Sequence, residues 1–173
     1  MKETISDLKA RRSVRAYSDK PIPADVLDEI LETATYAPTG MGAQDVMIVC
    51  VTDPKVRDVV RRLNGAVMGN PDGDPFYGAP VVALVFANRE RVTHVEDGAL
   101  VTGAILNAAY ALGVDSCYIF RAKESFETDE GRALARSWGV PDSYIGVGTA
   151  ILGYRSGEYP TPRPRKEGYI VKV

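Results

Sequence analysis

The sequence predicts an α+β fold in which helices flank a small central sheet. Several segments carry apolar residues at the spacing of an amphipathic helix, and three short continuous apolar runs, rich in β-branched residues, are typical of buried strands. The 173 residues suffice for one domain with an adequate core. No internal repeat, low-complexity block or linker interrupts them before residue 150. We therefore expect a single domain over residues 1–173, with a C-terminal arm over about 155–173.

The helices are recognised by their apolar spacing and by the residues at their ends. A short amphipathic helix is expected around Ile5 and Leu8. In the helix that follows, Pro23 suits the first turn. The last helix is ended by Gly139 and Pro141. The longer segments predicted to be helical are 24–36, 54–63, 98–114 and 128–138.

The segment 98–114 (GALVTGAILNAAYALGV) has helical length but almost no polar face. A helix that is apolar on all sides must be buried on all sides. In a chain of this size it is either a central core helix or a helix at a large subunit interface, and we favour the interface. Asp97 stands where its carboxylate would cap the helix and complement its dipole.

Strands are predicted where the apolar runs are too short for helices. Residues 46–52, 81–87 and 144–152 are continuous runs of this kind, and 117–120 is a further strand or strand end. The arm over 155–167 is too rich in Pro and charge to pack as a helix. The last six residues, GYIVKV, alternate like a strand, so we expect this segment to pair elsewhere, possibly on another subunit.

Three segments are expected to be irregular. Residues 17–23 are extended, because Pro21 and Pro23 disfavour helix before them. Residues 37–44 (APTGMGAQ) form a loop rich in Gly and Pro. Residues 64–80 contain four glycines and three prolines and form the longest irregular stretch, which we predict to be functional rather than filler.

The composition excludes several classes of protein. The formal net charge of −2 gives no general attraction to nucleic acid or to an anionic membrane. No apolar run is long enough to span a membrane, and the polar start lacks the apolar core of a signal peptide, so a cytoplasmic location is expected. Cys50, Cys117 and the single His94 cannot readily form a zinc site or a His-based catalytic triad. No metal is expected, and any chemistry needs an organic cofactor.

Positive charge is concentrated at two points that lie far apart in the sequence. Three arginines fall within residues 11–15 (RRSVR), and Arg163, Arg165 and Lys166 lie near the other end. Without these six cations, 15 remain against 23 acidic residues. Arginine is planar, always charged and suited to bidentate binding of phosphate. If folding joins the two clusters, they form one site for a phosphorylated small molecule; otherwise they are two solvated charge runs.

The order of several motifs resembles the FMN-dependent nitroreductase family over essentially the whole chain. The resemblance begins with RRSVRAYSDKPIP and APTGMGAQ and continues through DPFYGAP at 74–80. It ends with GVDSCYIFRAKE at 113–124, GVGTAILGY at 146–154 and PRPRK at 162–166. The resemblance implies a nitroreductase-like fold with a central mixed or antiparallel sheet flanked by helices. It also implies an intertwined homodimer that holds two FMN molecules in its interface, with the C-terminal arm crossing to the partner.

The resemblance also assigns residues to the cofactor. The N-terminal motif that it matches holds the flavin phosphate, ribityl chain and pyrimidine edge, and the C-terminal motif adds phosphate ligands, with Lys166 placed to share that task. The loop at 38–40 reaches the flavin of the other subunit, and the backbone of 116–119 runs beside the isoalloxazine ring. The residues implied to bind the cofactor are Arg11, Arg12, Ser13, Arg15, Pro38, Thr39, Gly40, Gln44, Asn64, Cys117, Tyr118, Ile119, Arg163 and Arg165.

Some positions depart from the family pattern or allow two interpretations. Relatives commonly have Asn where this chain has Gly42, and a Pro-Trp pair where it has Asp45 and Val46, which implies fewer side-chain contacts to the ring. Asn64 either contacts the pyrimidine or ribityl edge or caps a helix C-terminus. Cys117 has apolar neighbours, which favours a buried, inert thiol.

The resemblance implies an FMN oxidoreductase that works by ping-pong transfer. NAD(P)H would deliver hydride to flavin N5 and leave, and an electron-poor acceptor such as a nitroaromatic or a quinone would then bind the same face. No side chain need be catalytic, because the flavin carries the chemistry. No G-x-G-x-x-G follows an early strand, so NAD(P)H would visit the flavin transiently. The alternatives are a dimer that stores or senses flavin with little turnover, and the same fold with another phosphorylated ligand.

Overall fold

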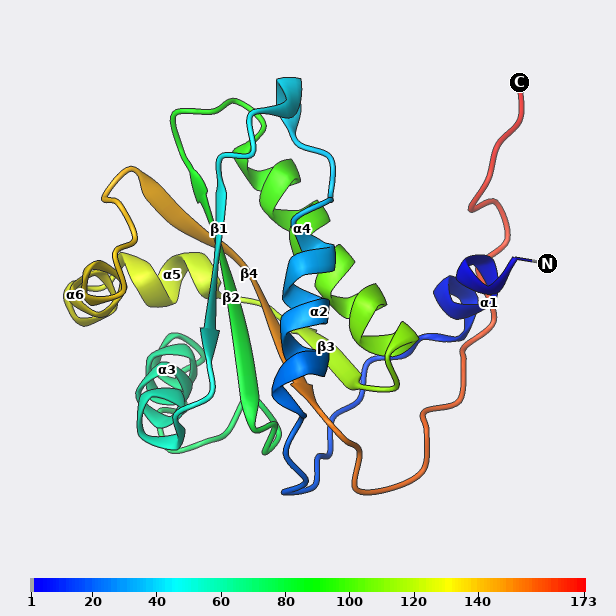
Figure 1. Ribbon diagram of the computed structural model, residues 1–173, viewed down its shortest axis with the longest axis horizontal. Helices are drawn as coiled ribbons and strands as arrows, with labels where there is room; N and C mark the ends of the chain where they lie inside the picture. The colour runs from blue at the N-terminus through cyan, green and yellow to red at the C-terminus, as the bar shows by residue number, and fades with distance from the viewer. Residues whose placement is uncertain (1) are drawn as a thin grey trace.

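The computed structural model describes residues 2–173 and shows a four-stranded antiparallel sheet with helices on both faces (Figure 1). The strands are ordered β1-β2-β4-β3 across the sheet. They are β1 (Val46–Val51), β2 (Val81–Asn88), β3 (Asp115–Ile119) and β4 (Tyr144–Gly153). The helices are α1 (Glu3–Ala10), α2 (Ala24–Ala34), α3 (Pro54–Val67), α4 (His94–Ala111), α5 (Ala122–Glu127) and α6 (Asp129–Ser137), with a short 3-10 turn at Gly40–Gly42. The α+β prediction is confirmed.

The central strand β2 explains why the sheet is covered on both faces. Its side chains alternate, so that Phe86 points to one core and Val85 to the other. Phe86 packs edge-on against Phe126 of α5, with ring centroids 5.0 Å apart, on the face that α3, α5 and α6 cover. On the opposite face, α2 and α4 cover the sheet, and Ile30 and Ile105 are completely buried. A strand buried on both faces reads as a continuous apolar run, as the sequence shows.

Several predicted boundaries were wrong. Helix α3 runs four residues beyond Leu63, so the irregular stretch begins after Val67 rather than at residue 64. Helix α4 begins one turn early, at His94. Asp97 therefore does not cap it; the N-cap is Thr93, and Asp97 lies inside the first turn. The six-residue helix α5 was missed altogether.

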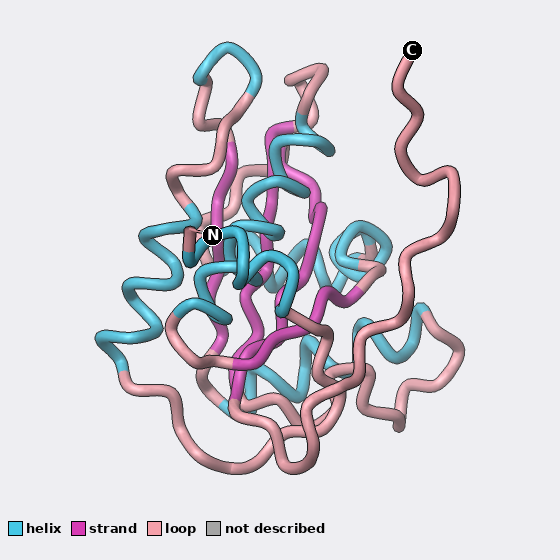
Figure 2. Tube along the Cα trace, turned by 90° about the vertical axis from the view of Figure 1, so that its right-hand side faces the viewer, coloured by secondary structure: helices cyan, strands magenta, loops and turns pink. Residues whose placement is uncertain are grey.

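The C-terminal segment GYIVKV was predicted to be a strand, and that prediction was wrong for the single chain. The structure shows turns and extended backbone there, without a partner strand within residues 2–173. The arm leaves the end of β4 and runs along the outside of the molecule (Figures 1 and 2). Its apolar side chains Tyr169, Ile170 and Val171 are largely exposed. A strand needs a neighbour for its backbone hydrogen bonds, and this chain alone does not supply one.

Asp45, where the chain departs from the family pattern, joins the ends of three strands. Its carboxylate accepts hydrogen bonds from Tyr144 Oη at 2.5 Å, Arg91 Nε at 2.8 Å and Asn88 Nδ2 at 3.1 Å. These bonds, that of Tyr144 foremost, lower the pKa of Asp45 to about 2. The residue thus fixes the start of β1 against the end of β2 and the start of β4.

The lowered pKa of Asp45 predicts a dependence of stability on pH. An acidic group whose pKa is lower in the folded state stabilises that state above its unfolded pKa of about 3.9, and the contribution is lost as the pH falls from there through about 2. Asp45→Asn should therefore have a lower melting temperature than the unmodified protein at pH 7, and the difference should shrink below about pH 3. Thermal unfolding of both proteins across this range measures it. A difference that stays constant with pH would contradict this role for the carboxylate.

None of the helices within residues 2–173 combines the length and the apolar character that crossing a membrane requires.

Candidate functional site

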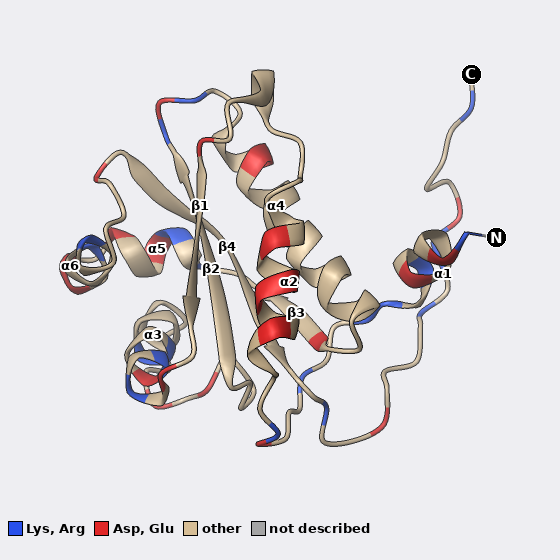
Figure 3. Ribbon diagram, viewed as in Figure 1, with Lys and Arg blue, Asp and Glu red and all other residues tan. Residues whose placement is uncertain are grey.

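The two arginine clusters meet in the folded chain. Arg12, Ser13 and Arg15 from the N-terminal segment line one open hollow of about 640 Å³ together with residues of the C-terminal arm. The lining residues of the arm are Pro160, Thr161, Arg163 and Arg165. Figure 3 shows the basic stretches of the two segments next to one another below α1. The alternative of two separate solvated charge runs is therefore wrong. We call this hollow, with its seven lining residues, the arginine hollow.

The N-terminal segment is held against the sheet by its buried residues. Val14 is buried, and its N–H donates to the carbonyl oxygen of Ser116 in β3 at 3.0 Å. Tyr17 is also buried, and its hydroxyl donates to the Val14 carbonyl oxygen at 2.9 Å. Because side chains alternate along extended backbone, anchoring Val14 inward leaves Ser13 and Arg15 facing the hollow.

The arginine side chains have no acidic partner. Within residues 2–173, no ion pair with a carboxylate involves Arg12, Arg15, Arg163 or Arg165. The guanidinium groups of Arg12, Arg15 and Arg165 instead donate to nearby backbone carbonyls, as Arg165 Nη2 does to the Arg163 oxygen at 2.6 Å. The hollow therefore carries uncompensated positive charge and suits a dianionic phosphate.

Two buried guanidinium nitrogens, Nη1 of Arg11 and Nε of Arg12, have no hydrogen-bond partner within the described chain. Buried polar groups in proteins are almost always paired, so an unpaired buried donor calls for an explanation. An anionic ligand placed at the N-terminal segment would supply acceptors for such donors. The residues present therefore fit a phosphorylated ligand.

Strand β3 forms the edge of the sheet beside the arginine hollow. The Ser116 carbonyl oxygen, bonded to Val14, faces outward, and strand alternation directs the backbone groups of Tyr118 to the same side. The side chains of Cys117 and Ile119 are buried, in agreement with an inert thiol, while that of Tyr118 is half-exposed. Five residues of strand span roughly 15 Å, so this edge offers an extended platform of backbone groups that starts at the hollow.

Asn64 closes the far end of this edge. It lies inside α3, whose C-cap is Met68, so the capping interpretation is wrong. Its side chain is buried; Nδ2 donates to the Phe120 carbonyl oxygen at 2.9 Å, and Oδ1 accepts from Arg121 Nε at 3.2 Å. Asn64 thus fixes the corner at which β3 ends, where Arg121 adopts a left-handed backbone with φ of 78°.

Phe120 lies at the same corner and is not among the residues predicted to bind the cofactor. Its side chain is 67% exposed although it is large and apolar, and its N–H has no backbone acceptor within residues 2–173. The alternation that brings Tyr118 to the surface would have indicated Phe120 as well, since it lies two residues further along the chain.

The loop around residues 38–44 does not reach the arginine hollow of its own chain. It precedes β1 and lies at the top of Figure 1, away from the arginine hollow. Gly40 N–H donates to Asp97 Oδ1 at 2.8 Å, and a Cβ at Gly40 would clash with Thr93. Gln44 N–H donates to Thr39 Oγ1 at 3.0 Å, and both residues line a separate hollow of about 510 Å³ between α2 and β1. Pro38 belongs to the same loop.

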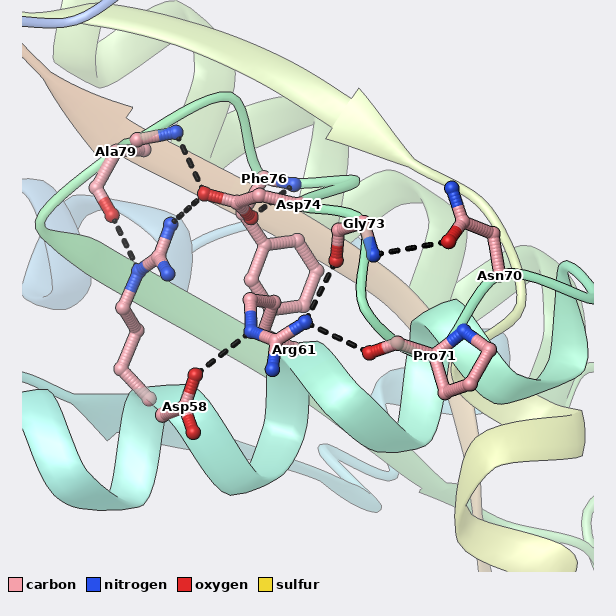
Figure 4. A network of polar contacts seen from close by, with 10 residues as sticks. Asp58, Arg61, Asn70, Pro71, Gly73, Asp74, Phe76 and Ala79 are labelled. Atoms are coloured by element: carbon pink, nitrogen blue, oxygen red, sulfur yellow. Dashed lines mark hydrogen bonds and ion pairs between the residues drawn. The ribbon is translucent and has the colours of Figure 1, made fainter.

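The loop between α3 and β2 is rigidly clamped to α3 (Figure 4). Arg61 Nη1 donates to the carbonyl oxygens of Pro71 and Gly73 at 2.8 and 2.7 Å. Arg57 pairs with Asp74 at 2.7 Å. Although burial acts to raise the pKa of Asp74, the hydrogen bonds from Arg57 and from two backbone N–H groups hold it below its usual value.

The two aromatic residues of this loop differ in environment. Phe76 is completely buried and packs in the core. Tyr77 is exposed, with a positive φ of 54°. The irregular stretch is thus a loop with defined contacts to α3 and to the core.

Comparison with known proteins gives consistent matches. Residues 8–76 match the sequence profile of the Nitroreductase family. An FMN-bound nitroreductase from Bacteroides fragilis superposes with a TM-score of 0.91 at 32% identity, covering 100% of both chains. A protein named NADH dehydrogenase from Thermus thermophilus is 36% identical over 87% of this chain and 68% of its own length. An FMN reductase [NAD(P)H] from Bacillus subtilis is 28% identical over 88% of this chain, which spans only 55% of that relative.

A structural match over the full length of both chains and the matched N-terminal motif point to the same assignment: this chain belongs to the nitroreductase family.

Proposed function

We propose that this protein is an FMN-dependent oxidoreductase that carries reducing equivalents from NAD(P)H to an electron-poor acceptor such as a nitroaromatic or a quinone. The observation that carries the proposal is the arginine hollow, where clusters from both ends of the chain meet and form no ion pair with a carboxylate among residues 2–173. FMN in the Bacteroides fragilis structure and the reductase name of the Bacillus subtilis relative agree with it. When bound, FMN would take up a hydride from NAD(P)H and pass it on in a second half-reaction.

The arginine hollow would hold the phosphate of the cofactor. Arg163 and Arg165 line the hollow, are exposed and carry guanidinium groups suited to bidentate contacts, while Ser13 offers a hydroxyl. Arg11 and Arg12 carry the buried unpaired nitrogens, which would donate hydrogen bonds to oxygen atoms of the ligand.

The outer edge of β3 would orient the ring system. Its backbone groups extend from the phosphate end at Ser116 to the corner held by Asn64. Main-chain donors do not titrate, so the ring would be positioned in the same way at every physiological pH. Tyr118 would contribute backbone contacts there, because its backbone groups face outward like those of Ser116. The backbone groups of Cys117 and Ile119 face β4 instead.

We further propose a homodimer in which the C-terminal arm crosses to the partner. Three features support it. The apolar end of the arm is exposed, β1 leaves the other edge of the sheet open, and a hollow of about 420 Å³ runs along β1. A strand-like segment can add to such an edge through backbone hydrogen bonds. The loop carrying Thr39, Gly40 and Gln44 would then meet the cofactor of the other subunit.

The redox function predicts a two-step spectroscopic result. Anaerobic addition of NADH or NADPH to the FMN-loaded protein should bleach its visible flavin absorbance, and a quinone or nitroaromatic added afterwards should restore it. Stopped-flow spectroscopy follows both steps separately. Free FMN at the same concentration is the control. Bleaching without recovery by any acceptor would favour the storage or sensing function, and mass spectrometry of the co-purified ligand would reveal a different phosphorylated compound.

A further inference from the structure

Tyr159 links the two ends of the chain through its hydroxyl group. The hydroxyl oxygen accepts a hydrogen bond from the Arg12 N–H at 2.6 Å and donates to the Ala10 carbonyl oxygen at 3.3 Å. Ala10 is the last residue of α1, where carbonyl groups lack partners inside the helix. One side chain of the arm therefore satisfies two backbone groups of the N-terminal segment.

The ring of Tyr159 is itself held in place from the sheet. The Arg155 guanidinium carbon lies 5.3 Å from its centroid, and the Tyr110 ring of α4 lies 6.1 Å away. Arg155 is tied to Asp115 at the start of β3: its N–H donates to Oδ2 at 2.9 Å, and its guanidinium lies 3.3 Å from the same oxygen. Asp115 is buried. The position of the hydroxyl is therefore set by contacts with the sheet and with α4, and not by the arm alone.

The hydroxyl lies where the two walls of the arginine hollow join. Pro160 and Thr161, the next two residues, line one wall, and Arg12 and Ser13 line the other. A change at Tyr159 would alter the spacing of the walls without removing any charge. Sites that are held in their binding geometry before the ligand arrives gain affinity, because less ordering is needed on binding.

We propose that Tyr159 is a positioning residue that assembles the arginine hollow for the phosphate group of its ligand. This inference rests on the proposed FMN-binding function and extends it to a residue that carries no charge. It predicts that Tyr159 affects the affinity only for ligands that carry the phosphate. Riboflavin has the same ring and ribityl chain but no phosphate, so its affinity should not depend on the spacing of the walls of the hollow.

The test is Tyr159→Phe, which removes the hydroxyl and keeps the ring. Dissociation constants for FMN and for riboflavin are measured by fluorescence titration of the apoprotein. One hydrogen bond contributes about 1 kcal/mol, so we expect FMN to bind about five- to tenfold more weakly and riboflavin to bind within about twofold of the unmodified protein. Tyr110→Phe is the matched control, because it removes a hydroxyl from the neighbouring ring. The dissociation constants of this variant for FMN and for riboflavin should both equal those of the unmodified protein.

The outcomes separate this inference from the function on which it depends. If the unmodified protein does not prefer FMN to riboflavin, the phosphate site itself is wrong. If that preference exists and Tyr159→Phe keeps it in full, the positioning role of Tyr159 is wrong and the proposed function stands. An equal loss for both ligands would also overturn the inference, since it would indicate general damage to packing.

Discussion

Arg165→Ala should weaken FMN binding at least about tenfold. A charge-assisted hydrogen bond contributes about 1.5–3 kcal/mol, and each 1.4 kcal/mol corresponds to a factor of ten in affinity. The Arg165 side chain is exposed, and its described contact is with the carbonyl oxygen of its neighbour Arg163. Its removal should therefore leave the folded chain intact. The melting temperature should fall only when FMN is present, because binding to the native state no longer stabilises it as much.

Arg12→Ala should show a comparable loss of affinity together with a loss of intrinsic stability. Its Nη1 donates to the Lys9 carbonyl oxygen at 2.7 Å and to that of Arg11 at 2.6 Å, which secures the end of α1. Comparing the two variants with and without FMN separates the binding effect from the folding effect. Exposed charges are screened by salt. The difference in FMN affinity between each variant and the unmodified protein should therefore become smaller as the ionic strength rises.

The matched control for the arginine variants is Arg132→Ala. It removes the same charge from α6, which covers the face of the sheet opposite to α2 and α4 (Figure 3). Its only described acidic partner is Asp129, three residues away on the same helix, so a small effect on stability is expected. FMN affinity should not change. Unmodified affinity in both Arg165→Ala and Arg12→Ala would count decisively against the phosphate site.

The buried strands could be predicted from the sequence because their cause is local. A run such as that of β2 is apolar at every position, since both faces of the strand are covered, and this pattern does not depend on knowing what covers it. Helix α5, which was not predicted, has no such local signal in the sequence. It is six residues long and follows a left-handed Arg121 without a side-chain cap, so neither periodicity nor a start signal marks it.

The start of α4 was predicted too late because its first turn is mostly polar. The apolar run begins at Gly98, whereas the helix begins four residues earlier, in the polar sequence His-Val-Glu-Asp. Asp97 was therefore assigned to the cap, although its carboxylate accepts hydrogen bonds from Thr93 and from Gly40 in a distant loop. Only the folded chain brings Gly40 to this helix, so sequence spacing could not have indicated the contact.

The sequence predicted what the two arginine clusters could bind, but not that they meet. Charge and residue type indicated that the two clusters suit a phosphate, yet their meeting depends on contacts with no local signature. Val14 must bond to Ser116, and the Tyr159 hydroxyl must reach the backbone of Arg12, 147 residues away. The resemblance to a family supplied what the physical reading of the residues left open.

Gly103→Arg should abolish dimer formation and flavin binding together. Helix α4 is not buried all round in the single chain: Ile105 and Ala109 face the core, whereas Leu100 and Asn107 are exposed. A Cβ at Gly103 would meet no atom within 4 Å. The chain by itself therefore has room for a side chain there, and replacing Gly in a helix interior favours the helix by about 1 kcal/mol. Within a closely packed dimer, the same side chain would place an unpaired charge in the interface.

Gly103 discriminates better than Ala108 on the same helix. Ala108 is buried against its own chain, so a large charged residue there would disturb the fold of the monomer as well as any interface. Gly103→Ala is the matched control, because it adds the same helix preference with little bulk. Sedimentation analysis and flavin content, measured together, should show a dimer with flavin for the Ala variant. For the Arg variant they should show a folded monomer without flavin. A monomer that still holds FMN would refute the proposal that the site is shared between subunits, because each chain would then complete its own pocket.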